Sequence, residues 1–373
     1  MSKWKYRDEG KMISKSVVAE KTTEDLLASR DFISDLLGLR KTQKLEKTYI
    51  NGTLKALEYT QTDNIYVDYR FDGTATGRLS CAMYSAEKPM GVSFHTLPRE
   101  TKHNIRSMFV APDGEGFITL DYSTMELRVL AILSRDDNMR SAFESGEDLH
   151  SYTGSLLFNK DISEVTPHER QMAKTVSFLV VYGGGAFNLA ETMGVSMRQA
   201  ESVVNTYREV YPGVFGFMDY VHNFIRENKY AYTILGRRRN LLDIDSGDKS
   251  TQHRSLRQGF NFVIQSTSSD ILLFSLLGIA NEFSDHGMKS RVVSTVHDSI
   301  EIVSPVDELE TTLSTAHYHM TQYPMLEKAF GHSFTVPFEI EALVGKSFGD
   351  GVEAKYTKGI VSNMDEIISY LGV

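Results

Sequence analysis

FITLDYSTMELRVLAIL, residues 117–133, predicts a short apolar strand followed at once by a helix. The strand carries a carboxylate near its end, Asp121. A second carboxylate, Asp298, lies between the apolar segments RVVSTV (291–296) and SIEIV (299–303), a pattern typical of a β-hairpin. A buried aspartate is costly unless it is paired or binds a metal. We therefore expect both aspartates to meet at one edge of a sheet and bind hard divalent cations, although either alone is more often a turn residue.

Helices surround these strands along the chain. Apolar spacing predicts helices over residues 22–60, 195–229 and 251–283. A capping pattern that starts at Thr166 predicts another helix, and the alternation in VPFEIEALV (336–344) predicts a final strand. Strands mixed with long helical insertions predict an α+β fold rather than a doubly wound sheet.

The charge of the chain is unevenly distributed. Its 373 residues carry a formal net charge of −9, an unusual balance for a protein that binds DNA. The excess of acid lies in residues 61–169 and 266–373, whereas residues 1–60 and 170–260 carry a small excess of base. We therefore expect phosphate contacts from the two basic segments.

Cysteine content and hydropathy exclude several classes of protein. The single cysteine, Cys81, excludes an intramolecular disulfide framework and a cysteine-based zinc site, and we expect it to be buried as a small apolar residue. No uninterrupted apolar run approaches the ~20 residues of a membrane span, and the charged N-terminus does not resemble a signal peptide. We therefore expect a cytoplasmic protein with no membrane partner.

The helix predicted from Thr166 carries four prominent side chains at steps of four residues: Arg170, Lys174, Phe178 and Tyr182. Each step turns by about 40°, so the four form one stripe. Two cations followed by two aromatics suit a nucleoside triphosphate that lies along the helix. Periodicity alone favours an amphipathic helix with its aromatics in the core.

Glu126 and Arg128 have simple alternative explanations. Glu126 follows Ser123 by three residues, which is the spacing of a helix capping box. Arg128 fits a solvated charge on the same helix.

Two further groups of polar side chains suit contacts with nucleic acid. Arg257, Asn261 and Gln265 repeat the four-residue spacing and offer donors to sugar edges and minor-groove acceptors. The run Arg237-Arg238-Arg239 suits contacts with backbone phosphates. A solvated polar face or charge cluster is the alternative in both cases.

Together these segments resemble family A DNA polymerases, the group of bacterial DNA polymerase I and its phage relatives. DYSTMELRVLAILSRD (121–136) is similar to that family's motif A, HERQMAKTVSFLVVYGG (168–184) to motif B and STVHDSIEIV (294–303) to motif C. Four more segments match in the same order: TATGRLS (74–80), EDLHSYTG (147–154), ILGRRRNLLDI (234–244) and RQGFNFVIQSTSSDI (257–271). Motifs of this length in this order outweigh the alternative explanations above.

The resemblance implies a right-hand polymerase architecture with an antiparallel palm sheet, helical fingers and a truncated thumb. We expect the thumb remnant and N-terminal helices in residues 1–59, the palm in 60–135 and 258–355, the fingers in 136–257 and a tail in 356–373. It also implies a template-directed DNA polymerase that adds deoxynucleotides to a primer 3′ end by two-metal-ion phosphoryl transfer. The expected partners are primer–template DNA and dNTPs. The expected cofactors are two Mg²⁺ ions, for which Mn²⁺ substitutes.

Roles carry over where positions match the family motifs. Asp121, Asp298 and the Tyr122 backbone would hold the metals, and Lys174 would join the two aspartates in catalysis. Glu126 would be the steric gate that rejects a ribose 2′-hydroxyl. The residues expected on the nucleotide are Glu126, His150, Arg170, Lys174, Phe178 and Tyr182. The residues expected on DNA are Arg78, Arg128, Arg237, Arg238, Arg257, Asn261, Gln265 and His297.

The sequence departs from the family pattern in two places. The family's motif C usually reads His-Asp-Glu, whereas Ser299 follows Asp298 here, and Glu301 on the same strand face would partly compensate. A His-Asp-Ser order also resembles single-subunit phage RNA polymerases, but the carboxylate of Glu126 and the presence of Phe178 argue against that assignment. The segment SFHTLP (93–98) lacks the asparagine and glutamine that the family places on the template and primer, so contacts from this loop stay open.

The family's members carry an exonuclease or exonuclease-like domain and a long thumb ahead of this region. We therefore expect no proofreading exonuclease in this chain, and we hypothesise a second polypeptide that supplies thumb and exonuclease. Two other functions stay open. Equal use of rNTPs and dNTPs would indicate an RNA polymerase or primase. Loss of extension in Asp121→Ala and Asp298→Ala proteins that still bind DNA would exclude a non-catalytic nucleic-acid-binding subunit.

Overall fold

The structure is a computed structural model, and it describes residues 7–8, 11–12, 23–82, 87–98, 104–331 and 334–372. The chain divides into two units: a smaller one of residues 1–68 and 83–93, and a larger one of residues 69–82 and 94–373. Each unit is described by itself. All of the predicted site residues belong to the larger unit.

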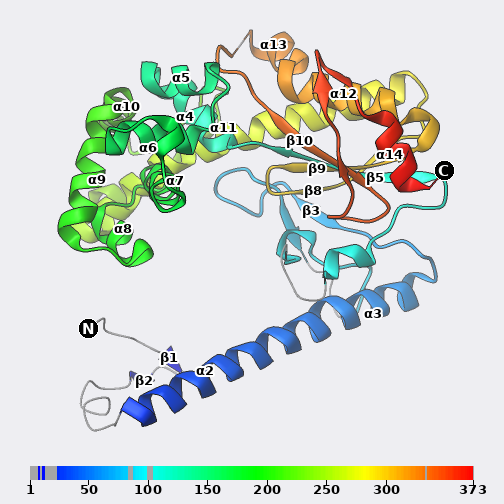
Figure 1. The fold of residues 1–373 in the computed structure, drawn as a ribbon, viewed down its shortest axis with the longest axis horizontal. Coiled ribbons are helices and arrows are strands. Elements are labelled where there is room, and N and C mark those ends of the chain that lie inside the picture. Colours follow the sequence, from blue (N-terminus) through cyan, green and yellow to red (C-terminus); the bar gives the residue numbers. More distant parts are fainter. Residues whose placement is uncertain are drawn as a thin grey trace. The chain divides into compact units, whose positions relative to one another are not determined.

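Helices dominate the described part of the smaller unit (Figure 1). α2 (Thr23–Lys44), a π-helical stretch (Leu45–Ile50) and α3 (Asn51–Thr60) follow one another without a break, which confirms the long N-terminal helical segment predicted from the sequence. Phe32 and Leu37 of α2 are 68% and 53% exposed. Burial within the described residues therefore does not explain the apolar spacing of this helix.

A five-stranded antiparallel sheet lies in the larger unit, in the order β11-β10-β5-β9-β8. Its strands are β5 (Glu115–Tyr122), β8 (Arg291–Val296), β9 (Ser299–Pro305), β10 (Ile340–Gly345) and β11 (Val352–Glu353). The hairpin predicted around His297-Asp298 is confirmed, because β8 and β9 pair on either side of these two residues. β5 is the middle strand, and its register sets Asp121 between Ser299 of β9 and Glu341 of β10.

The strand predicted to be the final one is shorter than predicted, and β11 follows it. β10 begins at Ile340, whereas the sequence pattern begins at Val336. Val336 and Phe338 are buried although they lie outside the strand. The side chains therefore alternate between buried and exposed before the strand begins, which explains why the sequence pattern starts earlier than the strand.

α11 (Lys249–Asp285) is the longest described helix and confirms the helix predicted over residues 251–283. It contacts α4, α10, α12 and β8, so it runs from the helical part of the larger unit to the sheet (Figure 1). Within the described part of the chain it is the one helix long and apolar enough, by length and composition, to cross a membrane, in contrast to the expectation from the sequence. Of its apolar window, 72% is buried inside the protein, as in a core helix.

Seven helices lie between β5 and α11: α4 (Met125–Ser134), α5 (Asp137–Glu144), α6 (Leu149–Phe158), α7 (Pro167–Val181), α8 (Ala186–Met193), α9 (Met197–Val210) and α10 (Pro212–Asn228). The capping box predicted at Thr166 is present, with Glu169 as its partner. The single helix predicted over residues 195–229 is wrong. Pro212 starts α10 and disfavours helical backbone at Tyr211, whose φ of −121° ends α9.

The remaining elements are short. They are β1 (Arg7–Asp8), β2 (Lys11–Met12), β3 (Asp68–Arg70), β4 (Ser80–Ala82), β6 (Tyr230–Tyr232), β7 (Arg238–Asn240), β12 (Tyr356–Thr357), β13 (Ile360–Val361), α12 (Leu309–Gln322), α13 (Pro324–Phe330) and α14 (Met364–Leu371), with 3₁₀ turns at Phe94–Thr96, Ile105–Met108, Ile162–Glu164, Leu242–Asp245 and Val306–Glu308. Cys81 of β4 is half-buried rather than fully buried, and its Sγ accepts a hydrogen bond of 3.2 Å from the Phe94 N–H.

Candidate active site

The two predicted aspartates lie at neighbouring strand ends. Asp121 is the penultimate residue of β5 and pairs in register with Ser299, the residue after Asp298. The Tyr122 N–H donates a hydrogen bond of 3.3 Å to the Asp298 carbonyl, which ties the end of β5 to the hairpin turn. His297 has a φ of 61°, a left-handed conformation that lets a two-residue turn close the hairpin. The structure therefore brings the two carboxylate-bearing backbones together as predicted.

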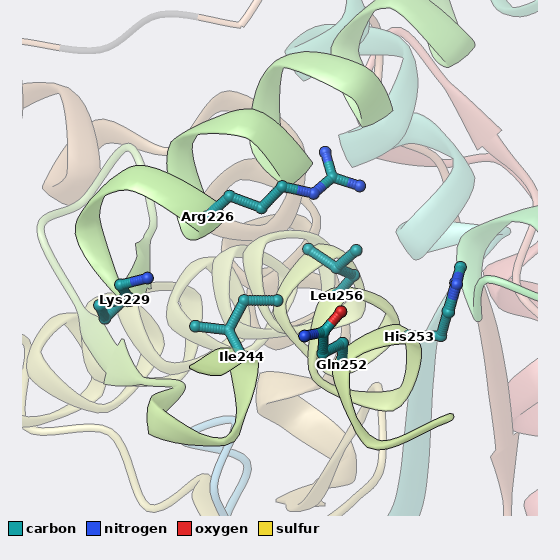
Figure 2. A pocket seen from close by; sticks show the side chains of 6 residues that line it. All are labelled: Arg226, Lys229, Ile244, Gln252, His253 and Leu256. Carbon is teal, nitrogen blue, oxygen red and sulfur yellow. The ribbon is translucent and has the colours of Figure 1, made fainter. Parts of the chain in front are cut away.

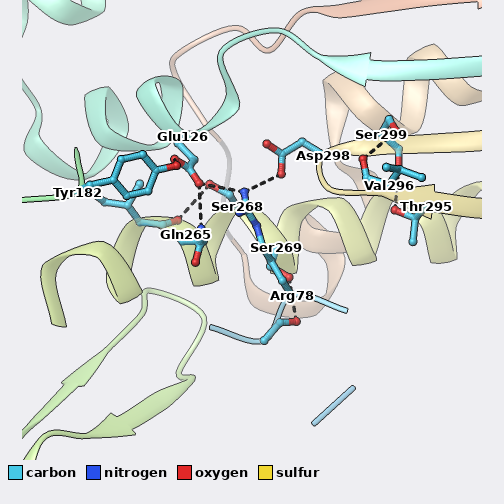
Figure 3. Close-up of polar contacts among 12 residues, drawn as sticks. Arg78, Glu126, Tyr182, Gln265, Ser268, Ser269, Thr295, Val296, Asp298 and Ser299 are labelled. Carbon is cyan, nitrogen blue, oxygen red and sulfur yellow. Dashed lines mark hydrogen bonds and ion pairs between the residues drawn. The ribbon is translucent and has the colours of Figure 1, made fainter. Parts of the chain in front are cut away.

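Arg78 joins Asp298 to Glu126 (Figure 3). One nitrogen of its guanidinium lies 3.0 Å from Asp298 Oδ1 and 2.9 Å from Glu126 Oε1. The Tyr182 hydroxyl donates to Glu126 Oε2 over 2.9 Å, and Gln265 Nε2 donates to Glu126 Oε1 over 3.3 Å. Five predicted site residues from distant parts of the chain thus form one connected network.

Glu126 is the centre of that network and is only 5% exposed. α4 begins at Met125, after Thr124, whose side chain caps nothing and whose φ is 50°. The alternative explanation of Glu126 as the partner of Ser123 in a capping box is therefore wrong. Burial and the nearby Glu126 charge both raise the pKa of Tyr182, so its hydroxyl stays protonated and remains a donor to this carboxylate.

α11 and the β6–β7 turn hold the loop that carries Arg78. The Ser269 hydroxyl donates to the Gly77 carbonyl over 2.9 Å. Arg237 forms an ion pair of 2.5 Å with Asp270, and its Cζ lies 2.7 Å from where a Cβ on Gly77 would be. Gly77 also has a φ of 73°, a left-handed conformation that favours glycine. Arg237, predicted to contact DNA, instead supports the Arg78 loop in this structure.

The stripe on α7 is present, but Arg170 already has a partner. Its guanidinium forms two hydrogen bonds, of 2.8 and 2.9 Å, to the carboxylate of Asp148, the N-cap of α6. Burial acts to raise the pKa of Asp148, but the hydrogen bonds from Arg170 and Ser151 outweigh it and lower that pKa to about 2. Lys174 is exposed one turn further along α7. Asp148 was predicted only as part of the segment EDLHSYTG, although its spacing to Ser151 is that of a helix cap.

His150 is buried beside this stripe, with its ring centroid 6.1 Å from that of Phe178. Burial is the main cause that lowers its pKa to about 4; the charges of Arg170 and Lys174 act in the same direction, and that of Asp148 opposes them. Its Nδ1 is buried and, among the described residues, has no hydrogen-bond partner. His150 is therefore a neutral imidazole with free hydrogen-bonding capacity at neutral pH.

His150→Gln should make stability less sensitive to acid. The unfolded chain takes up a proton at His150 near its ordinary pKa of 6.5, whereas the folded chain resists until about pH 4. The free energy of unfolding therefore decreases by about 2–3 kcal/mol as the pH falls from 6.5 to 4, for a pKa shift of this size. Urea unfolding at pH 7 and pH 4 should show a smaller loss in His150→Gln than in wild type. The exposed His168→Gln is the control, and an equal loss in all three proteins would contradict the assignment.

The second predicted stripe lies on α11 and partly faces the same network. Gln265 reaches Glu126, as described above. The stem of Arg257 packs on Gly183 at the end of α7, where its Cγ lies 2.6 Å from the position of an added Cβ. Asn261 Nδ2 is buried and has no hydrogen-bond partner among the described residues, and the same is true of Arg78 Nε. Such orphaned donors are costly, which suits a site that a ligand completes.

His297 has a neighbour that the sequence did not predict. The ring of His95, from the loop whose contacts stayed open, stacks on His297 with centroids 5.4 Å apart. His95 Nε2 lies 3.0 Å from the Thr295 carbonyl. A small cavity of about 20 Å³ between Arg78, His95 and His297 has room for a single water molecule. The contact between His95 and His297 could not be predicted from the sequence, because it depends on two loops that meet only in the folded chain.

The structure gives Arg128 a structural role in place of the predicted DNA contact. Its guanidinium is buried, donates to the carbonyls of Ser123 and Pro337, and forms an ion pair of 2.6 Å with Glu339. It also lies 4.5 Å above the ring of Phe143. A phosphate would have to break these contacts to reach it.

Ser299 and Glu301 form a buried pair behind the aspartates. The Ser299 hydroxyl donates to Glu301 Oε1 over 2.5 Å, and Glu301 is fully buried. Register sets Glu301 opposite Thr119, on the face of the sheet that Asp121 shares. The carboxylate predicted to compensate for Ser299 is therefore on the expected face, bonded to Ser299 itself.

The donor set fits magnesium. Mg²⁺ usually takes one or two protein carboxylates and fills its shell with waters and substrate phosphates. The described residues contain no group of three or more His, Cys, Asp or Glu side chains that could hold a metal. Asp121, Asp298 and the Tyr122 carbonyl match the smaller requirement. The Arg78 guanidinium on Asp298 shows that this carboxylate already attracts a cation.

A pocket outside this site lies between α10, the 3₁₀ turn Leu242–Asp245 and α11 (Figure 2). Its volume is about 200 Å³. It is lined by Arg226, Lys229, Ile244, Gln252, His253 and Leu256. Because no carboxylate lines it, this pocket lacks the oxygen ligands of a magnesium site.

The comparisons with known proteins agree with this geometry. A model of DNA polymerase family A matches residues 2–350. DNA polymerase I of Borreliella burgdorferi is 30% identical over 332 residues, which cover 88% of this chain and 35% of that protein. DNA polymerase I of Chloroflexus aurantiacus is 33% identical over 297 residues, or 79% of this chain and 30% of that protein. The chain thus spans about a third of the length of these relatives.

A solved structure is similar as well. The POL domain of Pol1 from M. smegmatis, in complex with DNA primer-template and dNTP, superposes with a TM-score of 0.76 at 28% sequence identity. The match covers 88% of this chain and 56% of that one.

Proposed function

The chain belongs to DNA polymerase family A, and from that premise we propose that it is a template-directed DNA polymerase that adds deoxynucleotides to a primer 3′ end. The observation that carries the proposal is the network in which Arg78 joins Asp298 to Glu126, with Tyr182 and Gln265 on the same carboxylate. It unites metal-binding, nucleotide-binding and DNA-binding candidates in one place. We propose palm segments at residues 60–135 and 258–355 and fingers at 136–257.

Asp121 and Asp298, with the Tyr122 carbonyl, would hold two Mg²⁺ ions, for which Mn²⁺ substitutes. When bound, such ions activate the primer 3′-hydroxyl and neutralise charge on the phosphates. Lys174 is exposed on α7 and binds the triphosphate. Arg170 binds it as well, and divides its hydrogen bonds between the triphosphate and Asp148. His150 stays neutral and offers a hydrogen bond to the same phosphates.

Glu126 and Phe178 shape the space for the sugar. Glu126 is buried and fixed by three hydrogen-bonded partners, so it cannot move aside at low cost. A 2′-hydroxyl beside it would crowd a carboxylate whose oxygens are already occupied. Asn261 Nδ2 and Arg78 Nε, which have no hydrogen-bond partner among the described residues, are buried donors available to the minor-groove edge of the primer–template.

Glu126→Ala should weaken discrimination against ribonucleotides. Removing the carboxylate opens space beside the sugar, and relief of such crowding is worth about 10- to 200-fold in the ratio of kcat/KM for dNTP over rNTP. Single-nucleotide primer extension with matched dATP and ATP measures this ratio. Glu126→Gln keeps the volume and is the matched control, which should retain most of the discrimination.

Two outcomes would contradict the gate assignment. Wild-type protein that uses both sugars equally would make the chain an RNA polymerase or primase. An unchanged ratio in Glu126→Ala would show that another group excludes the 2′-hydroxyl.

We also propose that this chain works with a second polypeptide that supplies thumb and exonuclease, in the cytoplasm of a bacterium or a phage-infected cell. The exposed apolar side chains of α2, Phe32 and Leu37, support such a contact. Affinity purification from the native host should recover a partner with exonuclease activity. Phe32→Ser/Leu37→Ser should lose it, whereas the exposed Leu242→Ser should not. Recovery of no partner, with full processivity of the isolated chain, would contradict this part of the proposal.

A further inference from the structure

A cluster of exposed aromatic side chains lies on α10 and the β6–β7 hairpin, outside the site described above. Tyr220 is 57% exposed and Tyr232 is 44% exposed. The ring of Phe224 lies 5.0 Å from that of Tyr232 and 5.3 Å from that of Tyr230. Arg238 places its guanidinium 3.7 Å above the ring of Tyr230. We call these five residues the aromatic patch.

The core does not explain the aromatic patch. Large aromatics scattered singly on a surface need no explanation, but four together with a cation form a surface suited to binding. Residues 219–240 carry the bases Arg226, Lys229, Arg237, Arg238 and Arg239 against the acids Asp219 and Glu227. In a chain of net charge −9, this segment is locally positive. Exposed rings beside positive charge are the composition that binds unpaired nucleic acid, because bases stack and phosphates pair with the cations.

The hairpin connects the aromatic patch to the active site. Arg237, which supports the Arg78 loop through Asp270 and Gly77, directly precedes Arg238. Arg237 lies in the turn before β7 and supports the Arg78 loop, whereas Arg238, the first residue of β7, covers the ring of Tyr230. Consecutive Cα atoms are about 3.8 Å apart. A strand that leaves the active site along this hairpin therefore meets the aromatic patch within a few nucleotides.

We propose that the aromatic patch binds the unpaired template strand ahead of the primer end. This inference rests on the proposed function, because it takes the network around Glu126 as the place of nucleotide insertion. Tyr220 and Tyr232 stack on template bases, and Arg238 pairs with the phosphate between them. The ligand class is single-stranded nucleic acid without sequence preference, since every base presents a face for stacking.

The test compares primer–templates that carry a 5′ template overhang with blunt duplexes of the same length. Fluorescence anisotropy without dNTPs should show the overhang substrate binding about 5- to 10-fold tighter, as expected for one or more stacked bases. Tyr220→Ala/Tyr232→Ala should lose this difference. Tyr318→Ala, which removes a 51% exposed tyrosine from α12, should keep it. Tyr220→Phe/Tyr232→Phe should also keep most of it, because the rings remain.

A second readout reports stacking directly. 2-Aminopurine, placed singly along the overhang, should be quenched by wild-type protein and should recover fluorescence in Tyr220→Ala/Tyr232→Ala. The inference would be overturned by equal fluorescence in that variant and in Tyr318→Ala, or by equal affinity for overhang and blunt DNA. Either result would indicate that the aromatic patch binds a protein partner instead. Both readouts need no turnover. Quenching without any primer extension would therefore contradict the proposed function and leave the aromatic patch standing, whereas normal extension without quenching would do the reverse.

Discussion

Asp121→Asn and Asp298→Asn should each reduce single-turnover primer extension by about 10³-fold or more while affinity for primer–template stays within a few fold. Asparagine keeps the shape of the side chain but removes the charge that a divalent cation needs. Both residues end up at one edge of the sheet because Asp121 pairs in register with Ser299 and the Tyr122 N–H bonds to the Asp298 carbonyl. The effect should therefore be on the chemical step rather than on DNA binding.

Rapid-quench kinetics and anisotropy on the same preparations measure the two quantities separately. Asp113→Asn, an exposed aspartate ahead of β5, is the matched control and should behave as wild type. Asp298→Asn also removes the ion pair to Arg78, so Arg78→Lys should be measured beside it. Full activity in either asparagine variant would end the metal assignment. An equal loss of activity and of DNA affinity would show that the aspartates have a structural role only.

Lys174→Ala should lower kcat/KM for dNTP by about 10²–10⁴-fold, the range for a group that both binds phosphate and transfers a proton. Lys174 stands on the face of α7 between Arg170 and Phe178, and it is exposed where a triphosphate would lie. Lys174→Arg separates the two contributions, because a guanidinium binds phosphate but does not give up its proton. We expect Lys174→Arg to recover KM and to leave most of the loss in kcat.

Steady-state kinetics of single-nucleotide insertion provide both constants. The exposed Lys328→Ala on α13 is the control and should leave both unchanged. If Lys174→Arg restores kcat together with KM, Lys174 acts only through its charge. If Lys174→Ala changes neither constant, the nucleotide does not lie along α7.

The local features of the site could be predicted from the sequence because they depend on neighbours in the chain. The β8–β9 hairpin and the start of α7 follow from apolar alternation and a capping box, and both were predicted correctly. Pro212 also carried a local signal for the break between α9 and α10, but helical periodicity on both sides obscured it. The ends of a helix or strand were therefore predicted correctly where the local sequence signal was strong, and wrongly where it was weak.

The contacts that make the site work are non-local and could not be predicted in this way. Glu126 matched a capping box by spacing, but long-range partners, among them Arg78 and Gln265, determine its conformation. Arg128 matched a solvated charge, and only the fold shows that it is buried against Glu339. The stacking of His95 on His297 likewise depends on two loops that are distant in sequence.

The most direct test of the central claim is a template-dependence assay with the purified wild-type chain. Four primed templates that differ only in the next unpaired base are each mixed with one dNTP at a time, with and without Mg²⁺. We expect extension by the complementary dNTP on each template, only when Mg²⁺ is present, and far less with the matching rNTP. Extension that ignores the template base, or no extension on any template with Mg²⁺ present, would contradict it.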